Sequence, residues 1–278
     1  MCVQAKADAT MTPRHDLLCL GLALGVAAMT VAPARAEQAV PPPAKVSCEA
    51  PAELTRIEYS LPRIQRRLAT KDAIKIVAIG SSSTYGAGAS SPAMSYPSQL
   101  EADLHALYRG VKITVLNRGI NGEIARDMLA RFDNDVIAEN PDLVVWQVGS
   151  NSVLKQLPIT PAKAVLRQGI AKIKAIGADV ILMNPQYAPK VISKPNIDRM
   201  VDLINATAGE EHVSLFQRFA IMRYWRLTRD VPFSVFLSPD ELHLNDWGYA
   251  CVAQHLADAI AEVVQRPTIT AGAVNARR

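Results

Sequence analysis

The stretch IVAIGSSSTYGAG, residues Ile76–Gly88, is an apolar run that stops at a glycine and continues into three consecutive serines. Its first four residues predict a buried β-strand, because a short continuous apolar run is typical of a strand covered on both faces. In open α/β sheets, ligands bind beyond the carboxyl ends of the strands. The polar residues that follow this run are therefore candidates for chemistry.

Along the rest of the chain, further apolar runs alternate with segments in which apolar residues have helical spacing. Such alternation is typical of a parallel sheet covered by helices on both faces. We therefore predict an α/β fold, a single-domain three-layer α/β/α sandwich with a central parallel sheet of about five strands. The predicted strands are Lys75–Ile79, Val111–Leu116, Leu143–Val148, Val180–Met183 and Val213–Phe216. The predicted helices are Ala52–Leu68 (with a break near Pro62), Ser95–Leu107, Ile124–Ala138, Ala162–Ile176, Pro195–Ala208 and Trp247–Val264, the last with Asp246 as its N-cap.

The composition fits one globular domain without a nucleic-acid surface. The chain has 278 residues, 49% of them apolar, and a net charge of +4, which is enough chain for one well-filled core. The densest basic patch is Arg63, Arg66 and Arg67. A group of this size is typical of a solvated helix face and lacks the density of a nucleic-acid footprint. We predict no nucleic-acid partner.

The N-terminal residues follow the pattern of an export signal. Arg14 precedes the apolar run Leu17–Val31, and Ala34-Arg35-Ala36 supplies small residues at the positions that a signal peptidase reads. We predict a signal peptide at residues 1–36, a linker at residues 37–50 and a flexible tail at residues 267–278. The alternative is a retained membrane anchor, although the run is short for a span of about 20 residues. Cleavage would leave no stable membrane span and a periplasmic or secreted protein.

Two of the four cysteines, Cys48 and Cys251, remain after the predicted cleavage. An exported protein meets an oxidising environment, so we predict a disulfide between them. The alternative is two separate buried thiols, because free cysteine packs well as a small apolar residue.

Polar clusters stand at four places where the carboxyl edge of a parallel sheet would gather them. They are Gly80–Thr84, Asn117–Gly122, Gly149–Ser152 and Asp240–His243. A serine hydroxyl is a weak nucleophile that needs a base, and the base needs an orienting acid. Asp240 lies three residues before His243, a spacing at which a turn lets the carboxylate reach the imidazole.

Each cluster taken alone has a structural explanation, as a turn, a cap or a core-edge residue. The four together, in this order, are much harder to explain in that way. Gly80–Gly86 is no phosphate loop, because the lysine and the serine or threonine of that motif do not follow it. Gly86-Ala87-Gly88 lacks the third glycine of a dinucleotide fingerprint. No spacing of ligands suggests a metal site, and we predict neither a metal nor a cofactor.

The sequence resembles the SGNH hydrolase superfamily, also called GDSL esterases/lipases, over roughly residues 75–261. The resemblance implies the flavodoxin-like SGNH fold and an SGNH hydrolase domain at residues 51–266. The family's Gly-Asp-Ser-x-Thr block matches Gly80–Thr84, which makes the middle serine, Ser82, the implied nucleophile. The Asp-x-x-His block matches Asp240 and His243 as the implied acid and base. Gly122 and Asn151 match the second and third blocks, so the implied oxyanion hole comprises the Ser82 N–H, the Gly122 N–H and the Asn151 side-chain amide.

Two positions differ from the family pattern. Ser81 stands where an aspartate usually precedes the nucleophile, and Ser152 stands where an aspartate often follows the third-block asparagine. Neither position belongs to the implied triad or oxyanion hole. The differences bear on the subfamily and hence on the substrate.

The resulting hypothesis is an exported serine esterase that hydrolyses a short acyl ester, carried by a small molecule or a glycan, through an acyl-enzyme. An envelope polysaccharide O-acyltransferase with the same triad is one alternative, and a non-catalytic carbohydrate-binding relative is another. Tyr187 and Trp247 are candidates for lining the substrate pocket. Packing in the core is the alternative for both.

Overall fold

The computed structural model describes residues 47–266, so the predicted signal peptide, most of the predicted linker and the predicted tail lie outside the described residues. The strands are β1 (Ile74–Gly80), β2 (Ile113–Gly119), β3 (Leu143–Gln147), β4 (Asp179–Met183) and β5 (Ser214–Phe216). The longer helices are α2 (Pro62–Thr70), α4 (Tyr96–Leu107), α7 (Thr160–Ala175), α9 (Ile197–Glu210), α10 (Arg218–Leu227) and α12 (Asp246–Gln265). The short helical segments are α1 (Ala52–Thr55), α3 (Ser82–Tyr85), η1 (Pro92–Met94), α5 (Ala125–Ala130), η2 (Asp133–Ile137), α6 (Ser150–Leu154), α8 (Pro189–Ile192) and α11 (Phe233–Phe236).

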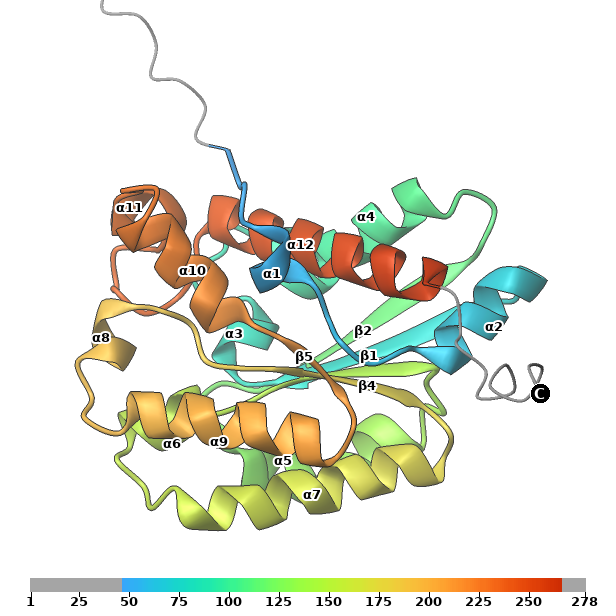
Figure 1. Ribbon diagram of the computed structural model, residues 1–278, viewed down its shortest axis with the longest axis horizontal. Coiled ribbons are helices and arrows are strands. Elements are labelled where there is room, and N and C mark those ends of the chain that lie inside the picture. Colours follow the sequence, from blue (N-terminus) through green and yellow to red (C-terminus); the bar gives the residue numbers. More distant parts are fainter. Residues whose placement is uncertain (1–46, 267–278) are drawn as a thin grey trace, which may run out of the picture. The chain divides into compact units, whose positions relative to one another are not determined.

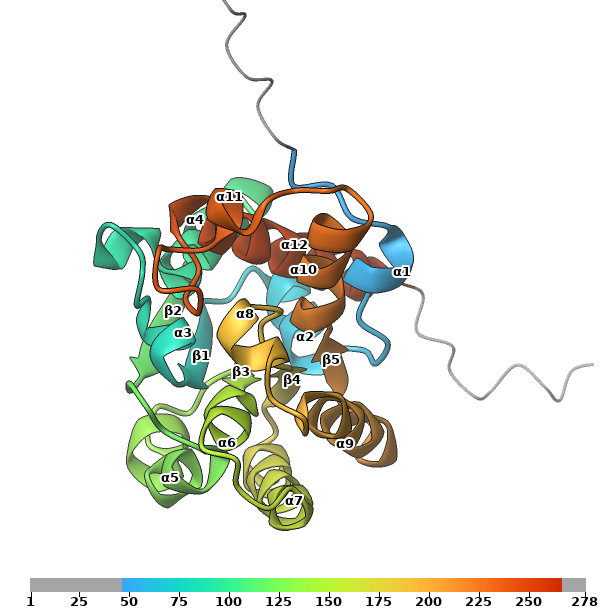
Figure 2. The ribbon, with the colours of Figure 1, turned by 90° about the vertical axis from the view of Figure 1, so that its left-hand side faces the viewer.

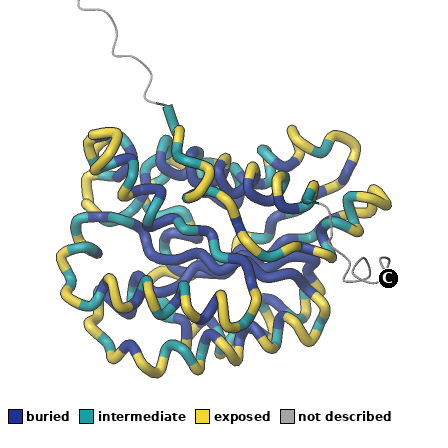
Figure 3. The backbone as a smooth tube through the Cα atoms, in the orientation of Figure 1, coloured by how far each residue is buried: buried dark blue, intermediate teal, exposed yellow. Residues whose placement is uncertain are grey.

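The five strands form one parallel sheet in the order β2-β1-β3-β4-β5. β3 and β4 are buried along their whole length, as continuous apolar runs require when both faces are covered. Helices α4 and α12 pack together over one face, and α5, α7 and α9 cover the other (Figure 1). Figure 3 shows the sheet buried between helices whose outer sides are exposed. The predicted three-layer α/β/α fold is confirmed.

Because every strand runs the same way, their carboxyl ends meet at one end of the sheet. Figure 2 looks onto this end, where α3, α6 and α8 lie in front of the strands. The register pairs Gly80 of β1 with Gly119 of β2, so these two neighbouring strands end side by side. The segments that follow them carry the first two polar clusters.

The segment Ala52–Leu68 is divided near Pro62, as predicted. It forms α1 and α2, and the buried residues Ile57 and Leu61 lie between these helices. A second predicted helix is interrupted where no break was predicted. The segment predicted as Ile124–Ala138 forms α5 and the π-helical η2. The interruption falls at Arg131, whose guanidinium donates to the Arg118 carbonyl at 2.9 Å instead of facing solvent.

The last helix has a different cap from the one predicted. Asn245 is the N-cap of α12, and its side chain accepts from the Gly248 N–H at 3.0 Å. Asp246 instead accepts hydrogen bonds from the Ser90 N–H at 2.8 Å and the Ser90 hydroxyl at 2.6 Å. It therefore ties the segment after α3 to the start of α12.

The predicted disulfide between Cys48 and Cys251 is present, with a Cα–Cα distance of 5.4 Å. The carbonyl of Cys48 also accepts from Trp225 Nε1 at 3.2 Å and lies 2.6 Å from His255 Nε2. The start of the described chain is thus fixed to α10 and α12. Within residues 47–266, the helices are too short or too polar to cross a membrane.

Candidate active site

Three side chains from opposite ends of the sequence meet at the carboxyl end of the sheet. The Oγ of Ser82 lies 2.8 Å from Nε2 of His243, and Nδ1 of that ring lies 2.5 Å from Oδ2 of Asp240. The ring is therefore held between a hydroxyl and a carboxylate through its two different nitrogens. This is the geometry in which an imidazole takes a proton from a serine while an acid fixes its tautomer.

Asp240 is fixed by more than the imidazole. Its Oδ1 accepts from the Ser238 hydroxyl at 2.7 Å and from the backbone N–H groups of Leu242 and His243 at 2.9 Å each. Partial burial opposes the charged carboxylate, but the hydrogen bonds from His243 and Ser238 outweigh it and hold the pKa of Asp240 well below its usual range. Asp240 is thus a stable negative charge beside the imidazole.

Of the three consecutive serines, only Ser82 is not fully buried; Ser81 and Ser83 are 2% and 1% exposed. The hydroxyl and the backbone N–H of Ser81 both donate to Oε1 of Gln147, each at 3.0 Å. Ser82 is the first residue of the one-turn helix α3. Ser81 thus anchors the turn, and Ser82 contacts His243.

Gly122 and Asn151, the predicted oxyanion donors, belong to segments that contact each other. Asn151 Nδ2 donates to the carbonyl of Glu123 at 2.9 Å, and Lys155 Nζ donates to the carbonyl of Gly122 at 2.8 Å. Gly122 has a φ of +78°, which glycine adopts without steric cost. The structure therefore brings the second and third clusters together beside the ends of β1 and β3.

The loop after β2 also lies against the turn that begins at Ser82. The Ile120 N–H donates to the carbonyl of Gly80 at 3.1 Å. A Cβ on Gly119 would lie 2.0 Å from the backbone nitrogen of Tyr85, so only glycine allows this approach. Ser82, Tyr85 and Ile120 consequently belong to one packed unit.

Arg131 contacts the same segments, and the sequence did not predict this role for it. Its guanidinium donates to the Arg118 carbonyl and, at 3.4 Å, to the Gly80 carbonyl. It also pairs with the carboxylates of Glu123 at 2.7 Å and Asp135 at 2.6 Å. The ends of β1 and β2 and the loop that carries Glu123 are thus fixed to one side chain.

A second arginine, Arg218, is fully buried behind the site at 0% exposure. Its Nε donates to the carbonyl of Asn184 at 3.2 Å, and its Nη2 donates to Oε1 of Gln186 at 3.0 Å. The same Gln186 oxygen accepts from the Ser150 hydroxyl at 2.6 Å, and Gln186 Nε2 donates to the Leu242 carbonyl at 3.4 Å. Burial lowers the pKa of Arg218 to about 10. Gln186 therefore links the Asn151 segment to the Asp240–His243 turn.

Gln147 and Gln186 were also missed at the sequence level, although a signal existed. Gln147 is the last residue of β3, in LVVWQ, and Gln186 comes three residues after the end of β4, in ILMNPQ. A polar residue at such a place is expected near the functional edge. The same criterion that selected Ser82 would have selected them as supports.

The two predicted pocket residues lie among aromatic side chains. The Tyr187 ring has its centroid 5.2 Å from that of Phe219 and 6.1 Å from that of Phe233. The Trp247 ring lies 5.3 Å from that of Trp225. These contacts support packing roles for Tyr187 and Trp247, and their part in a substrate pocket stays a prediction.

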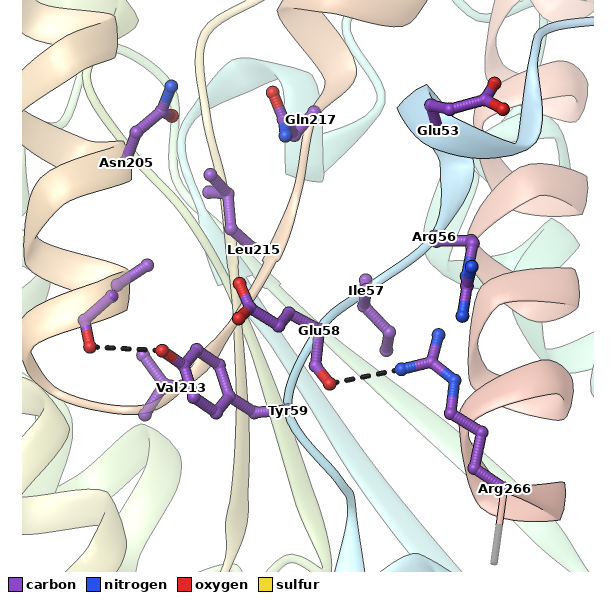
Figure 4. A pocket seen from close by; sticks show the side chains of 12 residues that line it. Glu53, Arg56, Ile57, Glu58, Tyr59, Asn205, Val213, Leu215, Gln217 and Arg266 are labelled. Atoms are coloured by element: carbon purple, nitrogen blue, oxygen red, sulfur yellow. Dashed lines mark hydrogen bonds between the residues drawn. The ribbon is translucent and has the colours of Figure 1, made fainter.

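A hollow of about 430 Å³ lies beside the edge strand β5 (Figure 4). Its walls are joined by bonds from Arg266 to the Glu58 carbonyl at 3.1 Å and from the Tyr59 hydroxyl to the Gly209 carbonyl at 3.2 Å. None of the four polar clusters contributes to its lining. It is therefore separate from the candidate active site.

Within residues 47–266, no three histidine, cysteine or acidic side chains are grouped as metal ligands.

The comparisons place the chain in the SGNH hydrolase superfamily, whose parallel α/β fold it has. The model of the Non-GDSL lipase-like family matches residues 47–266, and the chain belongs to this family. The family's name agrees with Gly80-Ser81-Ser82-Ser83, in which a serine stands in place of the aspartate of the GDSL motif.

The similar proteins are esterases. An acetylxylan esterase of Geobacillus stearothermophilus is 38% identical over 94 residues, covering 30% of this chain and 43% of the relative. An arylesterase of Vibrio mimicus is 31% identical over 125 residues, covering 45% of this chain and 61% of the relative. The chain thus spans about half the length of each relative. The crystal structure of a two-domain esterase active on acetylated mannans is 19% identical, with a TM-score of 0.63 over 76% of this chain and 56% of that one.

Proposed function

We propose that this protein is a serine esterase that hydrolyses a short acyl ester, such as an acetyl group, carried by a carbohydrate. The observation that carries the proposal is the contact between Ser82 and His243 at 2.8 Å, with Asp240 on the other ring nitrogen. The names of the similar proteins, an acetylxylan esterase and an esterase active on acetylated mannans, support the substrate class.

The chemistry follows from the positions of these atoms. Ser82 Oγ attacks the acyl carbon while His243 Nε2 takes the hydroxyl proton, and Asp240 stabilises the imidazolium that forms. The bond from the acyl carbon to the alcohol oxygen then breaks, and His243 returns the proton to that oxygen. Water attacks the acyl-enzyme and gives a proton to His243. His243 then returns this proton to Ser82 Oγ as the bond from the acyl carbon to Oγ breaks, which releases the carboxylic acid and restores the serine.

The negative charge on the carbonyl oxygen needs donors during both attacks. We assign this role to the N–H groups of Ser82 and Gly122 and to the amide of Asn151. Asn151 is supported by its 2.9 Å bond to the Glu123 carbonyl, which holds it beside the Gly122 loop. A donor fixed before the reaction costs no reorganisation when charge develops.

Substitution of the nucleophile tests the proposal. Ser82→Ala should lower kcat for p-nitrophenyl acetate and for acetylated xylo-oligosaccharide by about 10³-fold or more, because the covalent route is lost. Ser83→Ala, which changes the next residue, is the matched control and should keep most of the activity. Equal activity of Ser82→Ala and the wild type would refute the assignment.

Two alternatives have distinct outcomes in the same assay. For an O-acyltransferase, a sugar acceptor would divert the acyl group from water, so acetylated acceptor would accumulate at the expense of free acetate. For a non-catalytic carbohydrate-binding protein, the wild type would release no acetate, and a fluorophosphonate would leave Ser82 unlabelled.

The proposed location is the periplasm or the outside of the cell. The export pattern of residues 1–36 and the disulfide between Cys48 and Cys251 support it. Fractionation of cells that express the full chain tests it. A protein found in the cytoplasm with its first 36 residues intact would refute it.

A further inference from the structure

Among residues 47–266, four large apolar side chains are well exposed, and two of them flank the nucleophile. They are Tyr85, 58% exposed, and Ile120, 46% exposed; the other two are Leu107 and Leu227. Tyr85 is the last residue of α3, which begins at Ser82. Residues three apart in a helical turn project from the same side, so the Tyr85 ring and the Ser82 hydroxyl lie on neighbouring positions of one surface.

Ile120 is held next to this turn by the backbone. Its N–H donates to the Gly80 carbonyl at 3.1 Å, and Gly119 lies against the backbone nitrogen of Tyr85. The Asn117 side chain adds a bond to the Tyr85 carbonyl at 3.3 Å. Two exposed apolar side chains are thus fixed by rigid backbone at the rim of the site. The exposed part of each side chain leaves apolar area in water, which costs free energy.

We propose that Tyr85 and Ile120 form a substrate platform that binds the sugar ring carrying the ester. The proposal rests on the esterase function proposed above and adds the part of the chain that recognises the carbohydrate. A pyranose has an apolar face of C–H groups and a rim of hydroxyl groups. An exposed aromatic ring covers that face and leaves the hydroxyls in water.

The exposure of the platform favours a sugar over a long acyl chain. Binding of a long acyl chain gains free energy in proportion to the apolar area that is removed from water. An enclosed channel removes this area from water, whereas an open surface leaves most of it exposed. The residues that follow Tyr85 are Gly86-Ala87-Gly88, which offer little apolar area to extend the platform into a channel. A flat ring therefore matches the surface better.

The test compares two substrates that share the acetyl group. Acetylated xylotetraose supplies the sugar, and methyl acetate supplies none. Tyr85→Ala should raise the ratio of KM for the oligosaccharide to KM for methyl acetate by roughly tenfold, the size expected for the loss of one aromatic contact. Ile120→Ala should raise the same ratio less, and Tyr85→Phe should restore the wild-type ratio because it keeps the ring.

Leu227→Ala is the matched control, since Leu227 is equally exposed at 58% and lies on α10. It should leave the ratio unchanged. An unchanged ratio in Tyr85→Ala, in an enzyme that hydrolyses both esters, would overturn the platform and leave the esterase proposal standing. A change in the preference for acyl length, without a change in this ratio, would assign Tyr85 to the acyl group and overturn it too. Failure of the wild type to hydrolyse either ester would refute the esterase proposal itself.

Discussion

Asp240 binds His243 twice, through different oxygens. Oδ2 lies 2.5 Å from the ring nitrogen Nδ1, and Oδ1 accepts the backbone N–H of the same residue at 2.9 Å. One carboxylate therefore fixes both the position of the histidine backbone and the direction of its ring. The turn that carries the base and the contact that orients it are a single structural element.

This double contact predicts different effects for two substitutions of Asp240. In Asp240→Asn, the amide oxygen still accepts from the backbone N–H groups, but the NH₂ group faces His243 Nδ1. The ring must then carry its proton on Nε2, which can no longer accept from Ser82. We expect kcat to fall by about 10³- to 10⁴-fold with a melting temperature near that of the wild type.

Asp240→Ala removes the turn bonds as well, so it should lower both kcat and the melting temperature. The measurements are steady-state kinetics on p-nitrophenyl acetate and thermal unfolding followed by circular dichroism. Nearly full activity in Asp240→Asn would show that the tautomer of His243 does not depend on this carboxylate.

Asn151→Ala should reduce kcat by roughly 10²- to 10³-fold, as expected for the loss of one oxyanion donor. KM should change less, because the bond forms to the charge of the transition state. Asn205→Ala on α9 is a control for the loss of an asparagine side chain away from the triad. A loss of stability in Asn151→Ala that accounts for the loss of activity would instead support a purely structural role.

Asp179 predicts a dependence of stability on pH. Its carboxylate accepts the N–H groups of Arg63 at 3.3 Å and Ile64 at 2.9 Å, at the start of α2. Burial nevertheless raises the pKa of Asp179 from 3.8 to about 6. The folded protein binds the Asp179 proton more tightly than the unfolded chain does. The stability that this proton contributes is therefore complete below the unfolded pKa, and it is lost as the pH rises through about 6.

Asp179→Asn removes this titration. The free energy of unfolding of the wild type, minus that of the variant, should therefore fall between about pH 4 and about pH 7.5, by on the order of 2 to 3 kcal/mol. Urea unfolding at the two pH values measures it, and Asp198→Asn on the exposed side of α9 serves as control. A difference that grows with pH would contradict the sign of the shift.

Gln186→Leu should destabilise the protein by about 1 to 3 kcal/mol, because it leaves the buried Arg218 and Ser150 donors without their shared acceptor. Gln186→Glu keeps the acceptor and adds a charge opposite to that of Arg218, so it should retain more stability than Gln186→Leu. Chemical denaturation of the three proteins decides this order. The reverse order would show that the network is held by other contacts.

Replacing both Cys48 and Cys251 by serine should lower the free energy of unfolding, because the disulfide is lost. The cysteines are 203 residues apart, and the chain-entropy model gives about 5 kcal/mol for a loop of this size, with smaller values common in practice. The double variant compared with the reduced wild type separates the bond from the side-chain change. Equal unfolding midpoints for the oxidised wild type and the double variant would show that the bond adds no stability.

The strands and the contact between Asp240 and His243 were predictable because their signals are local. Continuous apolar runs fix β1, β3 and β4, and a three-residue spacing places Asp240 beside His243. The helix α10 was not predicted, and Arg218 shows why. Its charged side chain is fully buried, so it breaks the apolar pattern from which a core helix is inferred.

The supports of the site were missed for a related reason. Arg131 serves the site only because α5 ends early and turns the guanidinium toward carbonyl groups of Gly80 and Arg118. Nothing in the spacing of apolar residues reports such a turn. The N-cap of α12 is Asn245, one residue before the predicted Asp246. Asp246 instead accepts hydrogen bonds from Ser90, which is remote in sequence.

The bond between Cys48 and Cys251 closes a covalent ring that contains the whole candidate active site. All five strands, the proposed oxyanion donors and the three residues Ser82, Asp240 and His243 lie between the two cysteines in the sequence. A protease that cuts a single peptide bond within this ring opens it without releasing a fragment. The nicked molecule keeps every residue of the candidate site covalently connected to the others, so a single cut in an exposed loop does not by itself separate them.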